Sequence, residues 1–254
     1  MTLTLISCSH DDGGCHVIRN AVKDVDGNKY DAVRIGKQVW MQSNLRTTHF
    51  RDGSEIPQGT MQDWSRKNPY FYRPTLQDIP LYDEKTWGCY YNWPAVNDER
   101  GLCPKGWHVP TDAEWTEMEE FVGSKKQFVY GDDPSNIAKA LASTVGWVSV
   151  DTWSPPEYSG GSATEGSPGF EPEKNNSTGF SAMPISDYDV AIYGIFGSSA
   201  DFWSATEASN TSDYYYVYEA NEKAINRCIS FEYPILCKGP WFKFKGLSVR
   251  CVRD

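Results

Sequence analysis

The residues of this chain best suited to chemistry are its seven cysteines. Thiolates act as nucleophiles and metal ligands, and paired cysteines form disulfides. The spacing contains no C-x-x-C pair and no zinc pattern, so we expect no metal site and no cofactor. Cys228 and Cys237 flank a plausible turn at residues 231–234, which makes a disulfide across a hairpin possible. This number of cysteines favours an oxidising compartment, and the odd count requires an explanation.

Histidines and carboxylates give no equally clear signal of catalysis. The four histidines are scattered, and a structural role is favoured for each. Asp187 and Asp189 could lie on one side of a strand, as glycosidase carboxylates do, but a polar structural face is the favoured interpretation. No nucleophile-elbow, metalloprotease or phosphate-loop motif occurs. We therefore predict no catalytic residues and a protein that is not an enzyme.

Aromatic side chains are the other abundant resource, with ten Trp and fifteen Tyr. Tyr214, Tyr216 and Tyr218 alternate along a predicted strand and so share one of its faces. Such rings offer large apolar area with a polar group, which suits ligand contact, but they also build cores. Both interpretations stay open at the level of sequence.

Charge and hydropathy exclude two classes of protein. The formal net charge is −10, whereas a nucleic-acid-binding protein needs a basic surface to meet phosphates. No apolar run approaches the roughly 18 residues of a membrane-spanning helix. We expect contact with a membrane through a lipid anchor only.

The segment 101–123 positions these groups and has the clearest local structure. Pro104 and Gly106 predict a turn, and residues 107–109 predict a short strand. Thr111 and Glu114 form a T-x-x-E capping box, followed by apolar residues at helical spacing. A second helix is predicted from about Asp133 to Thr144.

Strands are expected on either side of these two helices. Asp26-Gly27 predicts a hairpin near the N-terminus and is favoured over a calcium loop. Further strands are predicted at residues 202–206, 214–219, 227–231, 241–244 and 247–252. A long loop is predicted at residues 154–179. Helices followed by antiparallel strands define the α+β class.

The N-terminus resembles a bacterial lipoprotein signal. Residues 5–8, Leu-Ile-Ser-Cys, resemble a lipobox, which would make Cys8 the lipidated residue. The acidic stretch after it resembles the export signal of Bacteroidetes surface lipoproteins. Only seven residues precede Cys8 and no basic region is present, so an ordinary acidic tail is the alternative. We expect residues 1–19 to form a signal remnant and tether on a surface-exposed outer-membrane lipoprotein.

Four motifs in order resemble the Fibrobacter succinogenes major paralogous domain family. They are DVDGNKYDAVRIGKQVWMQSNLRTTHFRDGSEIP at 24–57, GLCPKGWHVPTDAEW at 101–115, FWSATE at 202–207 and GLSVRCVRD at 246–254. The resemblance implies a single domain over residues 20–254 with a C-type-lectin-like fold, shared with the formylglycine-generating enzyme. It implies a Cys103–Cys251 disulfide, which leaves Cys15 and Cys89 to pair by elimination or to remain free.

The same resemblance directs attention to residues 203–244, which precede the last strand. Lectin-like folds commonly place their ligand face there, although the motifs of calcium-dependent lectins are absent. The candidate ligand contacts are Trp203, Tyr214, Tyr216, Tyr218, Trp241 and Phe244. We expect a non-catalytic surface lipoprotein that binds a glycan or protein ligand through aromatic residues. The alternatives are a structural subunit of a surface complex, and an oxidase like the enzyme relative, which a close thiol pair would favour.

Overall fold

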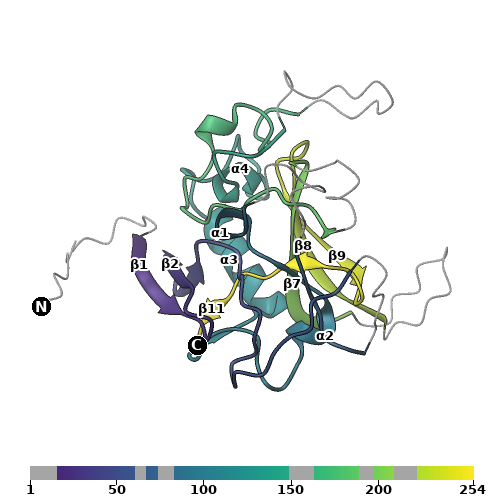
Figure 1. Cartoon of the computed structure of the whole chain (residues 1–254). Coiled ribbons are helices and arrows are strands. Elements are labelled where there is room, and N and C mark those ends of the chain that lie inside the picture. The colour runs from purple at the N-terminus through teal and green to yellow at the C-terminus, as the bar shows by residue number, and fades with distance from the viewer. Residues whose placement is uncertain (1–15, 61–66, 74–82, 149–162, 189–196, 209–221) are drawn as a thin grey trace, which may run out of the picture.

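The computed structural model describes residues 16–60, 67–73, 83–148, 163–188, 197–208 and 222–254 (Figure 1). Several residues named in the predictions lie outside these ranges: the lipobox with Cys8, then Cys15, Asp189, Tyr214, Tyr216 and Tyr218.

Two β-sheets and a few helices make up the described chain. The first sheet has the order β1-β2-β3-β11-β6 and the second the order β4-β5-β10-β7-β8-β9. Neighbouring strands are antiparallel except β10 and β7, which are parallel. This is the predicted α+β class, with two mostly antiparallel sheets.

The bounds of the elements are as follows. The first sheet contains β1 (His16–Lys23), β2 (Lys29–Ile35), β3 (Gln38–Met41), β6 (Trp107–His108) and β11 (Val252–Arg253). The second contains β4 (Phe71–Tyr72), β5 (Tyr90–Tyr91), β7 (Ser199–Glu207), β8 (Lys223–Ser230), β9 (Leu236–Phe242) and β10 (Leu247–Ser248). The helices are α1 (Glu84–Trp87), α2 (Trp93–Val96), α3 (Asp112–Gly123) and α4 (Ala138–Leu141), with a 3-10 turn at Pro172–Lys174.

The N-terminal hairpin forms as predicted, but it begins earlier than the predicted domain. Gly27 adopts φ +89° in the turn, and its N–H donates to the carbonyl of Asp24. The β1 strand pairs from His16 onward with β2, so residues 16–19 are sheet rather than tether. The pairs at His16, Val17 and Ile18, before an irregularity between Ile18 and Val22, extend the sheet because they satisfy backbone groups of both strands.

The α3 helix lies between the two sheets and organises the core. Its capping box is complete, with Thr111 and Glu114 each accepting a backbone N–H of the other. Trp115 packs against Trp40 of the first sheet at 4.7 Å between ring centroids, and against Phe202 of the second at 5.6 Å. The single apolar face expected for this helix therefore serves both sheets.

The second predicted helix is much shorter than expected. Only α4 is helical, and no side chain caps its N-terminus. Asp133, the expected cap, instead accepts hydrogen bonds from the N–H and hydroxyl of Ser135. This local turn competes with helix initiation, which is a known alternative for Asp side chains.

The predicted Cys103–Cys251 disulfide is present, and both residues are buried in an apolar cluster to which both sheets contribute. It joins the segment before β6 to the residue before β11, two strands that also pair directly. Within the described residues, no helix has the length and apolar character needed to cross a membrane.

Candidate functional site

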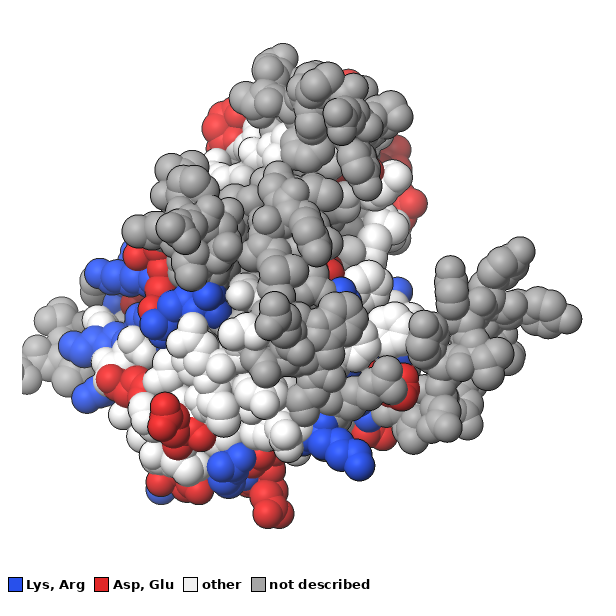
Figure 2. Space-filling view, turned by 45° about the vertical axis from the view of Figure 1, so that its right-hand side comes forward, with Lys and Arg blue, Asp and Glu red and all other residues white. Residues whose placement is uncertain are grey.

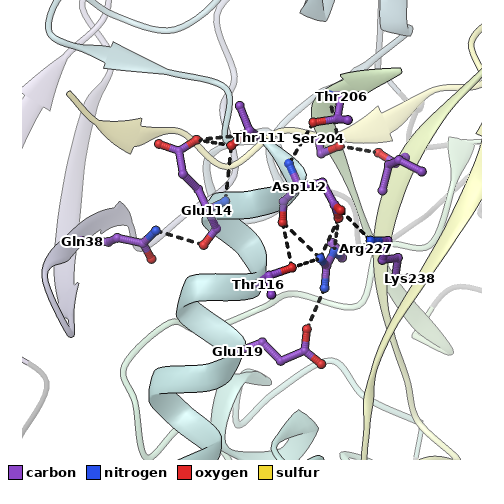
Figure 3. Close-up of polar contacts among 11 residues, drawn as sticks. Gln38, Thr111, Asp112, Glu114, Thr116, Glu119, Ser204, Thr206, Arg227 and Lys238 are labelled. Carbon is purple, nitrogen blue, oxygen red and sulfur yellow. Dashed lines mark hydrogen bonds and ion pairs between the residues drawn. The ribbon is translucent and has the colours of Figure 1, made fainter. Parts of the chain in front are cut away.

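The most developed polar cluster lies where the N-terminus of α3 meets the second sheet (Figure 3). Arg227 on β8 is at its centre and is only 1% exposed as a side chain. Its guanidinium donates to Asp112 Oδ1 at 2.6 Å and 3.0 Å, and to Glu119 Oε2 at 2.7 Å. It also donates to the hydroxyl of Thr116 at 2.8 Å. A buried cation is thus compensated by two carboxylates and a hydroxyl, all from one helix.

Asp112 connects this buried cluster to the surface. Its second oxygen accepts a hydrogen bond from Lys238 Nζ at 2.5 Å, and its backbone N–H donates to Thr206 Oγ1 at 3.0 Å. Partial burial acts to raise the pKa of Asp112, but the hydrogen bonds from Lys238 and Arg227 outweigh it and lower the pKa. The carboxylate is therefore held ionised at the first residue of α3, where the helix dipole also favours negative charge.

A hollow of about 340 Å³ opens beside this cluster. Charged residues of both signs and apolar residues line it: Asp112, Thr206, Glu207, Ala208, Ile225, Lys238, Gly239 and Pro240. Ile225 and Pro240 are direct cross-strand partners on β8 and β9. Proline can occupy this position because β9 ends the described sheet, where its missing N–H breaks no ladder. The hollow offers donors, acceptors and a small apolar surface together.

Aromatic rings continue the surface of the hollow along the same face of the sheet. Phe242 is two residues beyond Pro240 and pairs with Lys223, so its side chain lies on the face that carries Ile225. Phe244 stacks on Phe242 with centroids 5.3 Å apart. The ammonium of Lys223 lies 5.0 Å from the centroid of the Phe242 ring. We call the surface from Asp112 and Lys238 to Phe242 and Phe244 the β8–β9 groove.

The predicted ligand residues separate into four groups. Phe244 lies at one end of the groove. Trp241 is 38% exposed, but its side chain points to the opposite face of β9 because neighbouring strand residues alternate. Trp203 is completely buried, and its indole N–H donates to the carbonyl of Tyr91. Trp203 is therefore a core residue, and the prediction that it contacts ligand is withdrawn. The three tyrosines lie outside the described residues.

The predicted cysteine pairs have different outcomes. Cys228 and Cys237 are direct cross-strand partners, as the turn between them indicates, but both are free thiols in this structure. Cys89 is a free thiol as well, and its complete burial raises its pKa to about 12. The proposed partner of Cys89, Cys15, lies outside the described residues.

The histidines and remaining acidic groups show local hydrogen bonding. His108 lies between Asp254 and Glu114, at 2.6 Å and 2.7 Å, rather than in the core. Asp26 accepts hydrogen bonds from Thr47, Thr48 and His49 in the turn region. Among the described residues, no group of three or more His, Cys, Asp or Glu side chains could hold a metal ion.

Charges of both signs are interspersed on the face shown in Figure 2, where Lys and Arg side chains lie beside Asp and Glu. This distribution agrees with the mixed charges of the groove.

Sequence reasoning missed the Arg227–Asp112–Lys238 cluster. The capping box places Asp112 at the start of a helix, but nothing local indicates a cation 115 residues away.

The fold and the site define a disulfide-linked α+β domain with a mixed polar and aromatic groove. The sequence model of the Fibrobacter succinogenes major domain matches residues 33–253. The chain therefore belongs to this family, as its motifs indicate. No curated protein and no solved structure shows significant similarity to it.

Proposed function

We propose that this protein is a binding module of C-type-lectin-like fold, whose β8–β9 groove takes a glycan without catalysis. The observation that carries the proposal is the composition of the hollow itself. A sugar presents hydroxyls that both donate and accept hydrogen bonds, next to apolar C–H faces. The hollow places Lys238 and Asp112 beside the apolar pair Ile225 and Pro240, which matches both properties.

The aromatic end of the groove supplies the stacking surface that sugars commonly use. Phe242 and Phe244 are partly exposed, and their stacking on each other limits the rotamer freedom that binding must remove. Lys223, above Phe242, adds a donor at the rim. A glycan unit in the hollow and a second unit on the rings would together span the groove.

Rigid support of the groove favours binding over assembly. Asp112 and Thr206 are joined by a hydrogen bond, and Asp112 is fixed by Arg227 underneath. Groups held in this way lose little entropy when a ligand binds. A protein ligand, or a permanent neighbour in a surface complex, remains the alternative occupant of the same face.

We further propose that the protein acts at the cell surface of a Bacteroidetes-type bacterium, anchored to the outer membrane through a lipid on Cys8. The lipobox-like sequence and the acidic residues after it support this location. Metabolic labelling with an alkynyl fatty acid tests it. Labelling should be lost in Cys8→Ala, and label retained in that variant would contradict the anchor.

A glycan array with the full chain tests the binding proposal. The wild-type protein should bind a defined glycan set, and Phe242→Ala combined with Ile225→Ala should weaken that binding by about tenfold or more. Trp241→Ala is the matched control, because it removes an exposed ring from the opposite face of the same strand. Circular dichroism establishes that each variant is folded.

Two outcomes would change the conclusion. Loss of binding in Trp241→Ala with retention in the groove variant would place the ligand on the other face. A variant with Tyr214, Tyr216 and Tyr218 changed to Ala tests the tyrosine segment in the same way. Absence of binding to every glycan, together with a stable oligomer in solution, would favour the structural role.

A further inference from the structure

The face of the second sheet opposite the groove carries a row of three reactive groups. Asp201 on β7, Cys228 on β8 and Cys237 on β9 are direct partners across adjacent strands. The register is continuous on both sides of Cys228, so the three side chains project from the same face. Arg227 and Lys238, their neighbours in sequence, project from the groove face.

The two thiols are placed to form a disulfide without movement of the backbone. Direct antiparallel partners have Cα atoms about 4.5–5.5 Å apart, within the range that disulfides use. Cys228 lies between Cys237 and Asp201 in this row, so its thiol neighbours both groups. Both are partly exposed, whereas the Cys103–Cys251 disulfide is buried in the core.

We propose that Cys228 and Cys237 form a redox-active dithiol, in which Cys237 attacks a partner's disulfide and Asp201 takes the proton of Cys228.

The electrostatics support this division of roles. The neighbouring Cys228 side chain lowers the pKa of Cys237, which favours the thiolate. The Cys237 side chain, burial and the Asp201 charge raise the pKa of Cys228, so this thiol needs a base. Burial, opposed by the Ser199 hydrogen bond and assisted by the charge of Asp187, raises the pKa of Asp201 to about 7. A carboxylate with that pKa can accept a proton near neutral pH.

The exchange conserves atoms and electrons. The Cys237 thiolate, whose proton has gone to solvent, bonds to one sulfur of the partner disulfide, and the other sulfur leaves as a thiolate. Asp201 then removes the proton of Cys228, whose sulfur attacks Cys237 and releases the second partner thiolate. The protein gains a Cys228–Cys237 disulfide, and two electrons pass to the partner, which is thereby reduced.

Oxidised glutathione is the probe that tests the roles of the two cysteines. With the full chain, Cys228→Ser should accumulate a mixed disulfide at Cys237, because no resolving thiol remains. Cys237→Ser should accumulate little adduct, and wild type should proceed to the intramolecular disulfide. Peptide mass spectrometry after alkylation identifies each product. An adduct that forms chiefly on Cys228, or equally on Cys228 and Cys237, overturns the proposal.

The role of Asp201 has a separate readout. In Asp201→Asn at pH 7, the mixed disulfide should persist about tenfold or more longer than in wild type, while its formation is little changed. Ser199→Ala, which removes a neighbouring hydrogen bond but keeps the carboxylate, is the matched control. Equal lifetimes in Asp201→Asn and wild type would remove Asp201 from the mechanism. Glycan binding serves as a folding check on the opposite face, so failure of the groove and failure of the dithiol are distinguishable.

Discussion

Arg227 and Lys238 bind the same carboxylate from different environments, which allows a sharp test of the cluster. The Arg227 side chain is 1% exposed and that of Lys238 is 51% exposed, and each forms an ion pair with Asp112. We consider the substitutions Arg227→Met and Lys238→Met, which keep side-chain length and remove the charge.

Removal of the buried cation should be costly. In Arg227→Met, Glu119 loses the hydrogen bond that it receives from this guanidinium, and Asp112 keeps only Lys238. Breaking a fully buried pair costs about 3–5 kcal/mol, and both carboxylates here are partly exposed, so we expect the lower end, about 3 kcal/mol. Lys238→Met should cost at most about 1 kcal/mol, because an exposed pair is screened by water.

Equilibrium unfolding in guanidinium chloride measures both free energies. The pH dependence gives a second criterion, because the folded pKa of Asp112 lies below its ordinary value. Stability from a lowered carboxylate pKa is present above the unfolded pKa, about 3.9, and is lost as pH falls through the folded pKa. The difference between wild type and Arg227→Met should therefore shrink as the pH falls below about 4. Equal costs for the two substitutions at pH 7 would refute the argument from burial.

Three further predictions concern other parts of the fold. Replacement of Cys103 and Cys251 by Ala should lower the unfolding free energy by about 5 kcal/mol, as the chain-entropy model gives for a separation of 148 residues; a loss below about 1 kcal/mol in a denaturant titration would contradict this. His108→Gln should lower the unfolding free energy most below about pH 6. Burial alone would lower the pKa of His108, but its two carboxylate partners raise it, so the stability that they contribute is lost as pH rises through the folded pKa. Unfolding at several pH values measures this dependence. Gly123→Ala should destabilise by about 1–3 kcal/mol despite a better helix propensity, because a Cβ would meet the Pro134 carbonyl oxygen at 2.5 Å; an increased melting temperature would disprove the close approach.

Local signals in the sequence predict those parts of the structure that depend on neighbouring residues. The capping box of α3 and the turn at Gly27 both form, because each is stabilised by contacts within a few residues. The strands predicted at 202–206 and 227–231 lie within or overlap β7 and β8, whereas the strand predicted at 241–244 overlaps the end of the longer β9. The second helix failed for a related reason. Asp133 has two local options, a helix cap and a turn with Ser135, and the sequence does not decide between them.

The candidate site depended on contacts that no local pattern reports. Trp203 and its neighbour Phe202 point to opposite faces of β7, and both are completely buried because each face is covered by other parts of the chain. Arg227 meets Asp112 only because α3 crosses β8 in the assembled domain. Cys228 was correctly expected to face Cys237, but the alignment of Asp201 with them required the pairing of β7 with β8.

The sequence by itself therefore determined the family, the α+β class, the main helix and the cysteines available for pairing. These follow from motifs and from periodicities that act over short distances. Only the tertiary structure decided which rings are buried, which charges meet and which face of the second sheet carries thiols. Those outcomes depend on strand register and on helix placement, since a shift of one residue exchanges the two faces of a strand.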